Sequence, residues 1–129
     1  MSPPTRDGRR QILVVDDDES IRSFVELVLD GEGYEVITAD NGAVALDIAS
    51  TQQPDLILLD MRMPVMDGWA FARAYRGRPG PHSPIVVITA APDAGQRAAE
   101  IKADGFLGKP FDLDELLETV DRYLGKNTT

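Results

Sequence analysis

Short, wholly apolar runs alternate along this chain with longer segments whose apolar residues recur at helical spacing. A strand without a polar face must be covered on both sides, and helices cover the strands of a parallel sheet in this way. Strict alternation with right-handed crossovers therefore predicts one doubly wound α/β domain with a five-stranded parallel sheet and five helices. The predicted strands are 11–15, 34–39, 56–60, 85–90 and 105–108, and the predicted helices are 19–33, 43–50, 67–75, 93–103 and 113–124.

The apolar faces of the predicted helices follow the i, i+3, i+4, i+7 spacing. Asp18 or Glu19 lies where an N-cap or a first-turn acid is expected for the first helix. Asp93 and Gln96, three residues apart, predict a capping box for the short fourth helix. The expected inward faces of the first and last helices are Ile21, Phe24, Val25 and Val28, and Leu113, Leu116, Leu117, Val120 and Leu124.

The length of 129 residues is enough for one domain with a hydrophobic core and too short for two. Residues 1–10 are polar and contain two prolines, and we expect them to form a flexible N-terminal arm. The domain is predicted to span 11–125, and 126–129 form a C-terminal tail. No apolar run is long enough to span a membrane, so we expect a cytoplasmic location and no membrane contact.

The charge balance limits the classes of partner. A formal net charge of −9 argues against direct nucleic-acid binding, because neutralising phosphates requires a basic face. The chain has no cysteine, which excludes disulfides and thiolate metal sites.

Charged and polar side chains follow the predicted strands where each strand ends. Asp16 and Asp17 follow the first strand and Asp60 ends the third, whereas Thr89 ends the fourth and Lys109 follows the fifth. In a doubly wound sheet the carboxyl ends of the strands form the ligand-binding edge. The sequence therefore predicts that three carboxylates, one hydroxyl and one ammonium group converge there.

Clustered carboxylates repel one another unless a hard divalent cation such as Mg²⁺ or Mn²⁺ lies among them. We expect Asp17 and Asp60 to hold this cation, with Asp16 acting through water. Magnesium often shares its coordination with phosphate oxygens. A phosphoryl group at Asp60 would then meet the metal, the ammonium of Lys109 and the hydroxyl of Thr89, an arrangement suited to phosphoryl transfer.

The ordered segments VVDDDES, LILLDMRMPVMDG, VVITA and GFLGKPF resemble the receiver domain of bacterial two-component response regulators. The resemblance covers roughly residues 11–125. It implies a flavodoxin-like sheet of strand order 2-1-3-4-5. The interval from Thr89 to Lys109 is slightly shorter than is usual in that family, so the fourth helix is expected to be short.

The resemblance also implies a role for each site residue. Asp60 would be the phosphoacceptor, and Asp16 and Asp17 would be the acidic pair for the metal. The backbone carbonyl of Arg62 would be a further metal ligand.

Four more residues take family roles by resemblance. Thr89 would be the switch hydroxyl and Phe106 the switch aromatic residue. Lys109 would contact the phosphoryl group, and its bond to Pro110 would be cis.

The implied function is a signalling module that catalyses only its own phosphotransfer and dephosphorylation. A sensor histidine kinase or phosphotransfer protein would donate the phosphoryl group. The downstream protein would bind the face of helix four, strand five and helix five, and the chain would be a monomer or a weak phosphorylation-dependent dimer.

Three alternative functions fit the sequence less well. A receiver that is never phosphorylated would act as an interaction module, and such a receiver would be expected to lack one of the five site residues. An aspartyl-phosphate hydrolase would need a second acid where the chain has Arg62. A nucleotide or flavin binder would need a phosphate loop in place of the acids after the first strand.

Three further residues have candidate roles near the site or in packing. The long side chain of Arg62 could reach the phosphoryl group or hinder the attacking water. His82 could pass a phosphoryl group, but a surface-loop histidine without a function is the stronger interpretation. Trp69 is expected to be a packing residue.

Overall fold

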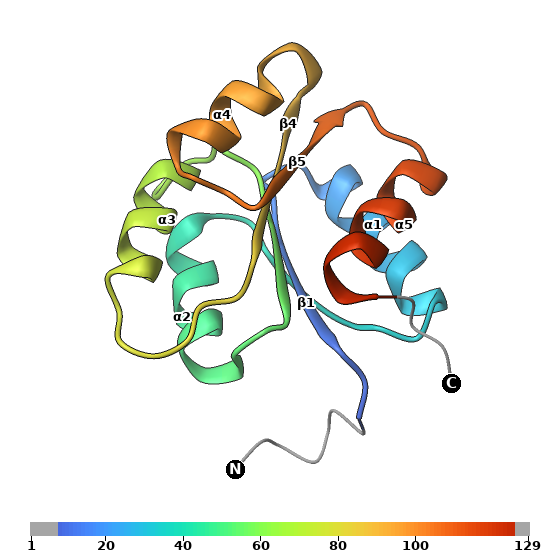
Figure 1. The fold of residues 1–129 in the computed structure, drawn as a ribbon, viewed down its shortest axis with the longest axis horizontal. Coiled ribbons are helices and arrows are strands. Elements are labelled where there is room, and N and C mark those ends of the chain that lie inside the picture. The colour runs from blue at the N-terminus through green and yellow to red at the C-terminus, as the bar shows by residue number, and fades with distance from the viewer. Residues whose placement is uncertain (1–7, 126–129) are drawn as a thin grey trace.

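The computed structural model describes residues 8–125 (Figure 1). Most of the predicted N-terminal arm and the whole predicted tail lie outside the described residues. The strands are β1 (Gln11–Val15), β2 (Glu35–Ala39), β3 (Leu56–Leu59), β4 (Ile85–Ala90) and β5 (Gly105–Lys109). The helices are α1 (Glu19–Gly31), α2 (Gly42–Gln52), α3 (Gly68–Arg76), α4 (Ala94–Glu100) and α5 (Leu113–Leu124), with a 3-10 helix, η2 (Ala91–Asp93), directly before α4.

All strand pairs are parallel, and the strand order is β2-β1-β3-β4-β5. Helices α1 and α5 cover one face of this sheet, and α2, α3 and α4 cover the other (Figure 1). The predicted doubly wound sheet is therefore confirmed.

Strand β1 contributes to both hydrophobic layers. Leu13 and Val15 pack among residues of α2, α3 and α4, whereas Ile12 and Val14 pack among residues of α1 and α5. None of the four side chains is exposed. Because full burial of one aliphatic side chain stabilises a fold by about 1.5–3 kcal/mol, this strand holds its carboxyl end firmly in place.

Helix α4 is short, as predicted, but its ends differ from the sequence prediction. Asp93 belongs to η2 and has φ −103° and ψ −8°, so its side chain does not cap the helix. The predicted capping box with Gln96 is wrong because η2 continues the turn into α4. The helix ends before the predicted position near 103, since Lys102 has φ +53° and turns the chain out of the helix.

Helix α5 begins with a capping box. The side chain of Asp112 accepts from the Glu115 amide, and the Glu115 side chain accepts from the Asp112 amide. Gly125, with φ +71°, ends the helix as predicted. The predicted apolar face is buried or half-buried except at Leu113, which lies in the first turn and is 46% exposed.

Candidate functional site

The ends of β1 and β3 place two acids side by side. Val15 and Leu59 are partners in the parallel register, so Asp16 and Asp60 leave the sheet together. The amide of Asp60 donates to the carbonyl of Val15 at 2.8 Å, which extends the pairing one residue beyond the strand. The two acids are therefore fixed relative to each other by the backbone.

Asp16, Asp17 and Asp60 form a carboxylate cluster in which one oxygen from each lies within 4.8 Å of the others. Asp16 is fully buried, Asp60 is nearly so, and Asp17 is exposed. Oδ1 of Asp16 accepts from the Asp18 amide at 2.9 Å, and the Asp16 carbonyl accepts from Arg22 at 2.8 Å. These bonds hold the acidic turn in one geometry.

Lys109 supplies the countercharge. Its Nζ lies 2.7 Å from Oδ2 of Asp16 and 3.6 Å from Oδ2 of Asp60. Burial lowers the pKa of Lys109, but the contacts with Asp16 and then Asp60 outweigh it, so the pKa is raised overall. Lys109 therefore stays protonated at neutral pH, and its bond to Pro110 is cis.

The side chain of Asp60 has one fixed oxygen. Oδ1 accepts from the Met61 amide at 2.8 Å, and Oδ2 is the oxygen that faces Lys109. Burial and then the charge of Asp16 raise the pKa of Asp60 to about 6, and Lys109 and the Met61 amide limit the rise. The carboxylate is therefore ionised at neutral pH but held at a cost in free energy.

The two predicted switch residues differ in exposure. Thr89 is buried and lies in β4 opposite Gly108 of β5. Phe106 is 55% exposed. Its ring lies over Gly95 of α4, where an added Cβ would come within 3.5 Å of the ring. The aromatic side chain thus rests on the short helix and does not fill the core.

The guanidinium of Arg62 lies over the ring of Trp69. Its guanidinium carbon lies 5.7 Å from the centre of the Trp69 ring, and that of Arg97 lies 5.6 Å from the same ring. Nε1 of Trp69 donates to Glu100 at 2.8 Å, and Arg97 pairs with Glu100 at 2.7 Å. The stacking on Trp69 gives Arg62 a contact other than the phosphoryl group, and its action there stays a hypothesis. Trp69 packs between these side chains and also makes a polar link to α4.

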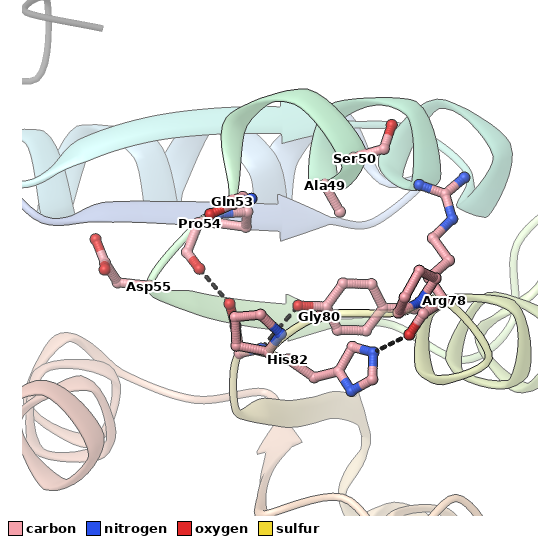
Figure 2. Close-up of a pocket in the computed structure, with 12 residues that line it drawn as sticks. Ala49, Ser50, Gln53, Pro54, Asp55, Arg78, Gly80 and His82 are labelled. Carbon is pink, nitrogen blue, oxygen red and sulfur yellow. Dashed lines mark hydrogen bonds between the residues drawn. The ribbon is translucent and has the colours of Figure 1, made fainter. Parts of the chain in front are cut away.

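His82 lies in the α3–β4 connection, at the end of the sheet opposite the carboxylates. It borders a hollow of about 470 Å³ between this connection and α2 (Figure 2). Nε2 of His82 donates to the carbonyl of Arg78 at 2.9 Å, and the Ser83 amide donates to the Tyr75 hydroxyl at 2.7 Å. These bonds stabilise the loop, and they place His82 in a structural contact away from the carboxylate edge.

Nearly the whole chain matches one known protein family. The family model of the response regulator receiver domain matches residues 12–121. The chain belongs to this family. Receiver domains are signalling modules of bacterial two-component systems and are not a conventional enzyme family.

Curated relatives of this receiver domain are longer proteins. The response regulator MprA of Mycobacterium tuberculosis (strain H37Rv) is 42% identical over 109 residues, which cover 83% of this chain and 47% of MprA. The DNA-binding transcriptional regulator NtrC of Klebsiella pneumoniae is 41% identical over 113 residues, which cover 86% of this chain and 24% of NtrC. The chain thus spans about half the length of one relative and a quarter of the other.

Solved receiver structures have the same fold. Chemotaxis response regulator CheY4 of Vibrio cholerae is 38% identical, with a TM-score of 0.81 over 89% of this chain and 98% of CheY4. The receiver domain of the sensor histidine kinase PA1611 from Pseudomonas aeruginosa is 32% identical, with a TM-score of 0.83 over 92% of this chain and 99% of that one. That structure has a magnesium ion coordinated in its active-site cleft.

The donor set of this receiver domain fits a hard divalent cation. The three clustered groups are all carboxylates, the ligand type that Mg²⁺ prefers. Oδ2 of Asp16 is buried, and the Lys109 ammonium 2.7 Å away is its one close partner among the described residues. Within residues 8–125, no helix has the length and apolar character needed to cross a membrane.

Proposed function

We propose that this receiver domain accepts a phosphoryl group on Asp60 from a histidine of a sensor kinase or a phosphotransfer protein. The observation that carries the proposal is the position of Oδ2 of Asp60. This oxygen lies 3.6 Å from the Lys109 ammonium. One carboxylate oxygen each of Asp16, Asp17 and Asp60 lies within 4.8 Å of the other two.

Phosphoryl transfer needs a positioned nucleophile and neutralisation of charge. An oxygen of Asp60 forms the new bond to phosphorus while the bond from phosphorus to the donor imidazole nitrogen breaks, and the electron pair stays on that nitrogen. Because the pKa of Asp60 is about 6, the carboxylate is ionised at neutral pH. Lys109 balances negative charge on the transferring group, and the hydroxyl of Thr89 donates a hydrogen bond to it.

Asp16, Asp17 and Asp60, with the backbone carbonyl of Arg62, would hold Mg²⁺ or Mn²⁺. When bound, the cation supplies positive charge next to the phosphoryl oxygens. The bonds from the Asp18 and Met61 amides orient the carboxylates of Asp16 and Asp60 in advance.

Phosphorylation would shift the domain between two surface states. Negative charge on Asp60 draws the Thr89 hydroxyl toward it. Phe106 can then leave its exposed position over Gly95 and move toward the vacated space. The face formed by α4, β5 and α5 changes accordingly and binds a downstream protein, with the domain as a monomer or a weak dimer. Hydrolysis of the acyl phosphate by the domain itself resets it.

The test is intact-mass spectrometry after incubation with acetyl phosphate, with and without Mg²⁺, beside the variant Asp60→Asn. One phosphoryl adduct that needs Mg²⁺ and is missing in the variant is the expected result. If no adduct forms under any condition, the domain is an interaction module that is not phosphorylated. Rapid multiple-turnover release of phosphate would instead identify a hydrolase.

A further inference from the structure

A basic groove lies between α3 and α4. Both helices cover the same face of the sheet (Figure 1). The groove is a hollow of about 470 Å³. Ala72 and Ile101 form its apolar floor, Trp69 forms one wall, and Arg73 and Lys102 are exposed at its rim. Its size is in the range of pockets that accept a small ligand or a few side chains.

The charge of this groove is opposite to that of the chain. The formal net charge is −9, yet five of the 13 basic residues border the hollow or stack on its tryptophan. Glu100 is the one carboxylate among the described residues that line the hollow, and Arg97 and Trp69 already bind it. These five bases are Arg62, Arg73, Arg76, Arg97 and Lys102.

Two of the bases have no partner within the described part of the chain. Arg76 donates to the carbonyls of Ile101 and Lys102 and so ties α3 to the end of α4. Arg73 and the Lys102 ammonium, by contrast, have no carboxylate of residues 8–125 within ion-pair distance. They are available to an anionic ligand.

Lys102 occupies a backbone position that favours glycine. Its φ is +53°, and the turn is closed by bonds from the amides of Lys102 and Ala103 back to the carbonyls of Ala99 and Ala98. In such a helix end a glycine avoids the strain that a side chain brings. The fold alone does not call for a lysine here, whereas an anion-binding rim does.

We propose that this groove is a docking surface for an acidic segment of a partner protein. Carboxylates of the segment pair with Arg73 and Lys102, and one apolar side chain packs on Trp69, Ala72 and Ile101. A nucleic acid fits less well because the rest of the chain is acidic and repels a long polyanion. None of the described residues that line the groove belongs to the carboxylate cluster, so the inference does not depend on the proposed function.

Trp69 is the only tryptophan in the chain, so its emission reports directly on the groove. The probe is a short acetylated peptide in which glutamates flank a leucine, and its counterpart carries lysines instead. We expect a saturable change in Trp69 emission with the acidic peptide, weakened by added salt, and none with the basic peptide. No saturable change up to about 1 mM, the weak end of specific binding, overturns the proposal.

Charge-reversal variants distinguish binding at this groove from a general effect of the net charge of the chain. Arg73→Glu with Lys102→Glu is expected to weaken peptide binding at least about tenfold, the equivalent of about 1.4 kcal/mol. The matched control, Arg9→Glu with Arg122→Glu, makes the same charge change at exposed positions elsewhere and should keep the wild-type affinity. Equal weakening by both pairs would overturn the proposal.

The single variant Lys102→Gly distinguishes loss of a binding residue from loss of the folded structure. It removes one rim cation and relieves the positive φ, so we expect weaker peptide binding together with equal or higher resistance to urea. Unchanged binding by this variant would contradict the proposal. Tighter binding of an oligonucleotide, or self-association lost in the charge-reversed pair, would assign the groove to another occupant and equally overturn it.

Discussion

The charge of Asp60 is expected to destabilise the fold when no cation is bound, and the variant Asp60→Asn tests this. Asparagine has nearly the same shape and can still accept the bond from the Met61 amide. Lys109 keeps its closest partner, because its Nζ lies 2.7 Å from Asp16 and 3.6 Å from Asp60. The substitution therefore removes one buried charge without leaving another unpaired.

The magnitude follows from the pKa. Burial and then Asp16 raise the pKa of Asp60 from 3.8 to about 6. A carboxyl group with a raised pKa stabilises the fold while it is protonated, so its contribution is complete below about pH 3.8 and is lost as the pH rises through about 6. At about 1.36 kcal/mol per pH unit, the difference corresponds to up to about 3 kcal/mol.

The assay is urea unfolding with EDTA present, from about pH 4 to about pH 8. We expect the stability of Asp60→Asn relative to wild type to increase by up to about 3 kcal/mol across this range. The contributions of the other titrating groups largely cancel when the stability of the wild type is subtracted from that of the variant. Asp17→Asn removes the same charge from an exposed side chain and serves as the control for the loss of one negative charge. A difference between Asp60→Asn and wild type that stays constant with pH would refute the reasoning.

Three further substitutions test the loop after β3 and the start of α3. Gly68→Ala should lower the free energy of unfolding by about 1–3 kcal/mol, because its Cβ would lie 2.6 Å from Sδ of Met61 and 2.8 Å from the carbonyl oxygen of Asp60; wild-type stability in urea would contradict this. Val65 has φ +70° and is 84% exposed. Val65→Gly should therefore raise the free energy of unfolding by about 0.5–1 kcal/mol. A lower midpoint in urea would be inconsistent with backbone strain at this position. Arg62→Ala should leave the dephosphorylation rate of the labelled protein unchanged, since its guanidinium stacks on a tryptophan ring; a changed rate would place that side chain at the phosphoryl group.

The sheet was predictable from the sequence because each strand is marked by its own short apolar run. The runs at 11–15 and 56–59 contain mainly aliphatic residues, and a strand covered on both faces buries such runs completely. The acids after β1 and β3 needed no further information, since residues that follow parallel strands must share one edge. Asp16 and Asp60 were therefore identified before their contacts were known.

Contacts of long or weakly constrained side chains were not predictable in the same way. The chain offers Arg62 both an anionic edge and an aromatic ring, and sequence spacing does not distinguish between them. The N-terminus of α4 was mispredicted because η2 leaves Asp93 in a helical backbone conformation, where its side chain cannot cap. The link from Trp69 to Glu100 joins residues 31 positions apart, and no local pattern marks it.

The acidic edge keeps its geometry through bonds that do not require a cation. The amides of Asp18 and Met61 hold the carboxylates of Asp16 and Asp60, and Arg22 holds the turn between β1 and α1. These bonds fix negative charges close together in a buried place, where they reduce the stability of the fold. A cation that binds the folded state relieves this repulsion and stabilises it by mass action. Mg²⁺ should therefore raise the unfolding midpoint of the wild type more than that of Asp60→Asn, because the same carboxylate that destabilises the free domain helps to bind the ion.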